Sequence, residues 1–253
     1  MIEVRDLSKS FGANHVLNGV SFRIEKGESV VIIGRSGGGK SVLLKHLIGL
    51  LKPDGGEVLI ENQNIVAMNE RELLPVRRKF GMLFQGAALF DSLTVAENVG
   101  FAFRRERSLT EGEIARRVAE VLETVDLPGT ESMNPAELSG GMRKRVGLAR
   151  AIIYQPEIVL YDEPTTGLDP IVSDSIDELM LRVRDRLHVT TVVVTHDMRT
   201  ARRLGQRILM LHDQRIYATG TAEALFGSKD PVVRQFIDGV SDEKAMAKKA
   251  ASV

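Results

Sequence analysis

The chain has 253 residues, 43% hydrophobic and 27% charged, enough to bury one large core or a core with a smaller lobe. Lysine and arginine number 34, as do aspartate and glutamate, so no overall charge favours nucleic acid or anionic lipid, and we expect no nucleic acid partner. The absence of cysteine excludes disulfides, thiolate metal sites and a cysteine nucleophile, and it fits a reducing compartment.

Strands are predicted first, at 2–7, 20–25 and 29–33, where short β-branched runs are separated by glycine-containing turns. The first two runs alternate polar and apolar residues, whereas SVVII at 29–33 is apolar throughout. This difference predicts an antiparallel lobe beside a buried central strand. A hairpin around Glu61-Asn62 and a strand at 79–84 follow.

The second half of the chain mixes helices with apolar strands. Apolar residues recur at helical spacing over 112–126, and with a helix after Ser139 they predict a mostly helical subdomain at about 87–155. Apolar runs at 157–161 and 190–195 flank a helix at about 170–187, and RILML and RIYATG form a final hairpin. Alternating strands and helices predict an α/β fold with a mainly parallel sheet covered on both faces.

Neither a signal peptide nor a membrane span is predicted. The N-terminus, MIEVRDLSKSF, carries charges where a signal peptide needs an apolar stretch. No run approaches the roughly 20 apolar residues that cross a bilayer. If the protein works at a membrane, we therefore expect another chain to hold it there. Residues 1–239 are assigned to one domain, and the small, charged segment 240–253 to a flexible C-terminal tail.

The segment GRSGGGKS at 34–41 fits the phosphate-binding pattern G-x-x-x-x-G-K-[ST], with a predicted strand before it and a helix after it. Glycines let successive N–H groups turn inward, and the helix beginning near Gly39 adds its positive end. We predict that Lys40 reaches the β- and γ-phosphates and that Ser41 ligates Mg²⁺. The alternative is a plain glycine-rich turn. The residues predicted to bind nucleotide here are Gly34, Arg35, Ser36, Gly37, Gly38, Gly39, Lys40, Ser41 and Val42.

Two adjacent acids, Asp162 and Glu163, end the apolar run IVLY. Because side chains alternate along a strand, we expect the two carboxylates to point in different directions. Asp162 is then predicted in the Mg²⁺ shell, and Glu163 as the group that orients or deprotonates the attacking water. A strand that simply ends in two solvated acids is the alternative.

The segment Leu138-Ser139-Gly140-Gly141-Met142, followed by RKRVGLARAI, resembles the signature sequence of ABC-transporter ATPases. Phe11, Gln85, Gly167-Leu168-Asp169 and His196 complete that family's ordered set, and the resemblance covers about residues 2–225. It implies a P-loop NTPase core with an antiparallel β lobe and a helical subdomain, and ATP and Mg²⁺ as cofactors. In this family the signature segment of one subunit grips the nucleotide of its partner, which implies a head-to-tail homodimer.

The resemblance assigns roles that each have a structural alternative. It implies that Phe11 stacks on adenine, that Gln85 contacts Mg²⁺ and water, and that His196 hydrogen-bonds the γ-phosphate. Phe11 and His196 could instead be packing residues. The catalytic set is thus Glu163, His196, Gln85 and Lys40. From the partner subunit, Ser139, Gly140 and Gly141 would clamp the γ-phosphate, and Asp169 would lie at the dimer seam. Ser139 and Asp169 could equally be helix N-caps.

Met142 stands where the commonest signature has glutamine, and this departure resembles lipid-transport ATPases of the Mla and mammalian-cell-entry (MCE) type. Segments 39–54, 84–101 and 233–239 strengthen that narrower resemblance. It implies a phospholipid-transport motor on the cytoplasmic face of the inner membrane, bound to a permease beside Gln85 and Ala87–Phe90, with an MCE-type lipid-binding protein and a small accessory subunit. The alternatives are another importer or exporter, a soluble ABC ATPase of DNA repair or translation, and a non-hydrolysing P-loop regulator.

Overall fold

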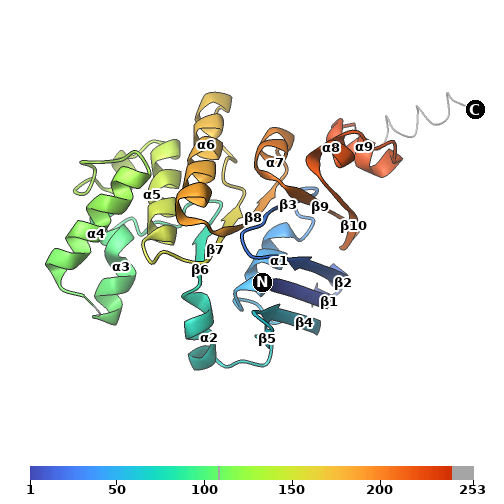
Figure 1. Cartoon of the computed structure of the whole chain (residues 1–253), viewed down its shortest axis with the longest axis horizontal. Helices are drawn as coiled ribbons and strands as arrows, with labels where there is room; N and C mark the ends of the chain where they lie inside the picture. Colours follow the sequence, from blue (N-terminus) through green and yellow to red (C-terminus); the bar gives the residue numbers. More distant parts are fainter. Residues whose placement is uncertain (108, 241–253) are drawn as a thin grey trace, which may run out of the picture.

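The computed structural model describes residues 1–107 and 109–240 (Figure 1). All but the first residue of the predicted tail, 240–253, therefore lies outside the described residues. Within the described ranges, no helix combines the length and hydrophobicity needed to cross a membrane. The chain folds into two sheets with helices around them, as the α/β prediction requires.

The first sheet is the predicted antiparallel lobe. Its strands follow the order β2-β1-β4-β5 and all pair antiparallel. Glu61 and Asn62 both adopt positive φ and close the predicted hairpin, as tight two-residue turns require. The bounds are β1 (Ile2–Phe11), β2 (Asn14–Ile24), β4 (Gly55–Ile60) and β5 (Gln63–Asn64).

The second sheet has the order β10-β9-β3-β8-β7-β6. All its neighbours pair in parallel except β9 and β10, which form the predicted final hairpin. Every residue of β3, β7 and β8 is buried, which explains their uninterrupted apolar runs. The bounds are β3 (Ser29–Ile33), β6 (Phe80–Leu83), β7 (Ile158–Asp162), β8 (Thr190–Thr195), β9 (Arg207–His212) and β10 (Arg215–Gly220).

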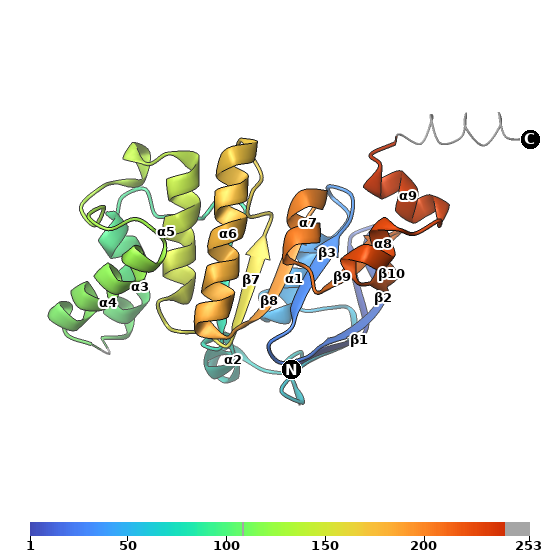
Figure 2. The ribbon, with the colours of Figure 1, turned by 45° about the horizontal axis from the view of Figure 1, so that its top comes forward.

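The helices occupy both faces of this sheet and its two ends. Figures 1 and 2 place α3, α4 and α5 at one end of the molecule and α8 and α9 at the other, with α6 lying between α5 and α7. The bounds are α1 (Lys40–Leu47), α2 (Glu70–Arg77), α3 (Val95–Glu106), α4 (Glu111–Thr124), η1 (Pro135–Glu137), α5 (Gly140–Ile152), α6 (Pro170–Leu187), α7 (Met198–Leu204), α8 (Ala222–Phe226) and α9 (Pro231–Ile237).

Helix α2 is an element of the first half that the apolar pattern does not predict. Pro75 lies inside it, where proline normally breaks a helix. Its start is nevertheless specified locally, because Asn69 and Glu72 form a reciprocal capping box. A capping box thus marks a helix that hydrophobic spacing misses.

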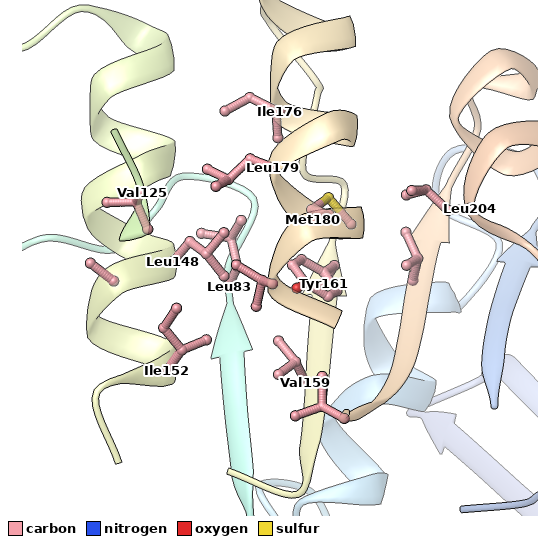
Figure 3. Close-up of a cluster of buried hydrophobic side chains, with 14 of the residues drawn as sticks. Leu83, Val125, Leu148, Ile152, Val159, Tyr161, Ile176, Leu179, Met180 and Leu204 are labelled. Carbon is pink, nitrogen blue, oxygen red and sulfur yellow. The ribbon is translucent and has the colours of Figure 1, made fainter. Parts of the chain in front are cut away.

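The core divides into two clusters on opposite faces of the parallel sheet. Val30 and Ile32 of β3 pack with α1 and the antiparallel lobe, whereas Val31 and Ile33 pack with the layer of helices α3 to α7. Figure 3 shows part of the second cluster, in which Leu148 of α5 and Leu179 of α6 meet Leu83 of β6. Strand alternation therefore builds two hydrophobic layers from one sheet.

Candidate nucleotide site

The phosphate-binding segment joins β3 to α1 at the carboxyl end of the sheet's central strand. Gly39 is the N-cap of α1 and has a φ of 93°. This left-handed conformation is strained for residues other than glycine. A Cβ at Gly39 would lie 2.9 Å from Val16 Cγ1, so glycine is required there for space as well. The segment therefore lies against the antiparallel lobe and presents the N-terminus of α1.

Lys40 is buried and points back across this segment. Its ammonium donates hydrogen bonds to the carbonyls of Gly34 at 2.8 Å and Arg35 at 3.1 Å. It also lies 3.3 Å from Glu163 Oε1. The cation is therefore placed between the glycine-rich segment and the acid that follows β7.

Ser41 and Asp162 form a close pair in the same site. Ser41 Oγ donates a 2.6 Å hydrogen bond to Asp162 Oδ1. Burial raises the pKa of Asp162, the Ser41 hydrogen bond opposes this shift, and the neighbouring Glu163 adds to it. Within the described residues no cluster of three or more histidines or acids could hold a metal. A hydroxyl and one carboxylate do suit Mg²⁺, which takes few protein ligands when phosphate oxygens supply others.

Glu163 lies just beyond the end of β7 and adopts a positive φ of 47°. Its Oε2 lies 2.8 Å from His196 Nδ1 and accepts a hydrogen bond from Thr166 Oγ1 at 3.0 Å. The two acids do face different partners. The reason predicted from strand alternation is wrong, because the left-handed turn of the backbone at Glu163 separates them.

The signature segment lies elsewhere in the molecule. Ser139 is exposed and caps α5, accepting a hydrogen bond from the Met142 amide at 3.2 Å. Helix α5 packs on the edge strand β6, three strand positions from β3. Asp169 is likewise exposed and caps α6 by accepting from Ile171 and Val172. Both residues act as N-caps and still present their helix ends to solvent.

Two of the predicted residues do not contact the group around Glu163. Phe11 is 48% exposed on the antiparallel lobe, with the Lys9 ammonium 5.4 Å from its ring centroid. The Gln85 side chain is exposed and makes no hydrogen bond to the site within the described part of the chain. The neighbouring apolar run is divided, since Ala87 is buried and Phe90 is exposed. Phe90 packs on Phe101 with ring centroids 4.7 Å apart.

Sequence reasoning misses two residues that contact this group, Thr166 and Lys144. Lys144 lies on α5, is buried, and donates hydrogen bonds to the carbonyls of Gln85 and Glu163. Burial lowers the pKa of its ammonium. The available signal was its helical spacing, because Lys144 falls on the same face as the buried Gly141 and Leu148.

Comparisons with known proteins agree with this geometry. Residues 17–166 match the ABC transporter family. The chain is 41% identical over 99% of its length to "Probable ribonucleotide transport ATP-binding protein mkl" of Mycobacterium leprae, and the match covers 75% of that protein. It is 40% identical over 96% of its length to "Intermembrane phospholipid transport system ATP-binding protein MlaF" of Haemophilus influenzae, 92% of which is covered.

A solved structure confirms the predicted fold. The "Dimeric Structure of MJ0796, a Bacterial ABC Transporter Cassette" superposes with a TM-score of 0.81 at 34% identity, covering 88% of this chain and 99% of that one. The same cassette has been solved in "a post-hydrolysis state" bound to ADP and Pi. By family match, relatives and fold together, the chain belongs to the ABC transporter family and is a nucleotide-binding ATPase of that family.

Proposed function

We propose that this protein is the ATP-hydrolysing motor of a membrane transporter that moves phospholipid between membranes. The observation that carries the hydrolytic part is the placement of Glu163 between Lys40 and His196, next to the Ser41–Asp162 pair. The likeness to MlaF, which spans almost all of both chains, supports phospholipid as the cargo. The mycobacterial relative is instead named for ribonucleotide transport, so ribonucleotide is the second candidate cargo.

Each side chain of the site has a task in this proposal. The N–H groups of residues 34–42 and the Lys40 ammonium bind the β- and γ-phosphates. Ser41 and Asp162, together with Gln85, would hold Mg²⁺, which would neutralise phosphate charge. Glu163 accepts a proton from the attacking water, and His196 donates a hydrogen bond to the γ-phosphate. Thr166 keeps the Glu163 carboxylate in place.

The exposure of Ser139, whose side chain hydrogen-bonds the Met142 amide and no residue of the phosphate segment within the described chain, supports a site shared by two chains. We infer a head-to-tail homodimer in which residues 34–41 of one subunit and 138–142 of the other enclose each ATP. Phe11 would stack on adenine and Asp169 would lie at the seam. The dimeric cassette among the similar structures supports this assembly. Because one γ-phosphate then contacts both subunits, hydrolysis would open the dimer.

The transporter partners follow from the same proposal. Residues 1–239 act as one ATPase domain, with a helical subdomain at about 87–155 that receives the permease beside Gln85 and the exposed Phe90. The resemblance to Mla and MCE systems adds a lipid-binding MCE-type protein and a small accessory subunit. The motor would then work peripherally at the cytoplasmic face of the inner membrane.

Purification of the native complex from membranes, with mass spectrometry of its proteins and lipids, tests this proposal. We expect Mg²⁺-dependent ATPase activity in a complex with a multi-span permease and glycerophospholipid. A permease complex without lipid that takes up labelled ribonucleotide would support the second cargo. Recovery without any permease would contradict a transport role, and absence of ATPase activity would contradict the assignment of Glu163.

A further inference from the structure

Lys144 is a buried cation on α5, with only 6% of its surface exposed. Its ammonium donates hydrogen bonds to two main-chain carbonyls, those of Gln85 and, at 3.1 Å, Glu163. Among the described residues no carboxylate lies within ion-pair distance of it. Burying a charge without an ion pair costs free energy unless hydrogen bonds compensate for it. The two carbonyls provide those hydrogen bonds, and they therefore indicate what Lys144 does.

One carbonyl belongs to a residue in an unfavourable backbone conformation, and the other lies two residues before such a pair. Glu163 itself has a φ of 47°, and Gln85 lies just before Ala87 and Ala88, whose φ values are 59° and 50°. Residues other than glycine are strained in this left-handed region. They keep such a conformation only where surrounding contacts hold it. The Lys144 ammonium provides one such contact for each of the two segments.

Helix α5 holds the Gln85 segment at a second point. Arg150, at the far end of the helix, donates hydrogen bonds to the carbonyls of Ala87 at 2.8 Å and Ala88 at 2.7 Å. Between the two cations lies Gly147, where a Cβ would approach Leu83 Cδ1 to 2.8 Å. Because Gly147 has no side chain, the backbone that follows Gln85 can lie directly on α5.

We propose that Lys144 is a positioning residue for ATP hydrolysis. It ties the main chains of Gln85 and Glu163 to α5, so that the helix capped by Ser139, the Gln85 segment and the water-orienting carboxylate keep one mutual arrangement. A displacement of α5 at a dimer or permease contact is then transmitted to the main chains of Gln85 and Glu163, through one hydrogen bond each. This inference rests on the proposed function, because it takes Glu163 to be the group that acts on water.

Steady-state kinetics of Lys144→Met and Lys144→Arg test the proposal. The Met variant keeps the length and the apolar stem but loses every donor, so kcat should fall at least about tenfold, the usual effect of removing a charged hydrogen bond. The KM for ATP should change less than about twofold, because residues 34–41 are untouched. The guanidinium of the Arg variant can reach two carbonyls and should recover kcat to within about threefold.

Arg116→Met is the matched control, because Arg116 is an exposed cation of the neighbouring helix α4 and forms an ion pair with Glu120. Its kcat and KM should equal those of the unsubstituted protein. A Met variant with unchanged kcat, one with raised KM alone, or an Arg variant as slow as the Met variant would overturn the proposal. A wild-type protein without ATPase activity would instead contradict the proposed function.

Amide hydrogen exchange provides a readout that does not depend on activity. Peptides covering 84–90 and 163–167 should exchange several-fold faster in the Met variant, while peptides covering 34–41 keep their rates. Unchanged exchange at 84–90 and 163–167 would overturn the proposal even if kcat fell. If the Met variant does not fold, Lys144→Gln, which keeps an amide donor on a shorter stem, should show the same pattern at smaller amplitude. Unchanged exchange in this variant would equally overturn it.

Discussion

The phosphate segment and the signature segment are built differently, although the proposed function needs both for one nucleotide. Residues 34–41, Glu163 and His196 follow three strands of one sheet, and their side chains contact one another at its carboxyl edge. Among the described residues, the Ser139 side chain hydrogen-bonds only within its own helix and stays exposed. One half of the site is therefore assembled inside the chain, whereas the proposed function assigns the other half to a partner subunit.

The largest effect should come from the assembled half. Glu163→Gln keeps the size of the side chain and an acceptor for Thr166, but it removes the proton acceptor, so kcat should fall about 10³-fold while ATP binding persists. ATPase assays and equilibrium binding of labelled ATP measure the two quantities. Glu120→Gln, at an exposed position on α4, is the control. Near-normal turnover in Glu163→Gln would contradict the assignment.

Ser139→Arg tests whether the exposed half serves the partner. In mixed dimers whose chains all carry Glu163→Gln, only one chain receives the arginine, and photoactivatable ATP labels each chain separately. Steric blockage should reduce labelling of the chain without arginine about 30-fold, and spare the chain that carries it. Exchanging the tags between the chains is the control. Loss confined to the arginine chain would refute the head-to-tail arrangement.

Thr166→Val probes the support of Glu163 inside one chain. Removing the hydroxyl that donates to Glu163 Oε2 should lower kcat about tenfold with little change in KM, since hydrogen bonds to charged groups are among the stronger ones. Thr166→Ser retains the donor and should behave as the unsubstituted protein. Equal kcat values for the Val and Ser variants would show that the hydroxyl does not position the carboxylate.

The smallest effect on activity concerns Asp177, which joins α6 to α7 through hydrogen bonds with Thr200. Burial raises its pKa to about 6, although hydrogen bonds from Thr200 oppose the shift. A raised aspartate pKa means that stability falls as pH rises from about 4 to 6 and stays reduced above that range. Asp177→Asn should therefore increase the free energy of unfolding at pH 8, by at most about 3 kcal/mol, and change it little at pH 4. Urea denaturation at both pH values measures this, and an equal gain at both would contradict it.

Local signals predict much of the fold. The bounds of β3, β8 and α6 match the prediction, because apolar runs and the Asp169-Pro170 cap specify them locally. The grouping of the site follows from the shared edge of parallel strands. The left-handed turn at Glu163 and the division of Ala87 from Phe90 depend on contacts between distant segments. The role of Lys144 also depends on distant contacts, since nothing near it in sequence predicts its hydrogen bonds to the Gln85 and Glu163 carbonyls. The catalytic and binding roles themselves stay predictions.

Strand β3 contributes to both hydrophobic clusters, because its alternate residues pack on opposite faces of the sheet. Loosening either layer therefore removes one wall of the strand that carries the phosphate segment. The strand itself cannot separate from the sheet while both layers remain packed, so the anchor of that segment has the stability of the whole domain. Nucleotide held there should accordingly protect the entire domain against heat, instead of stiffening a single loop.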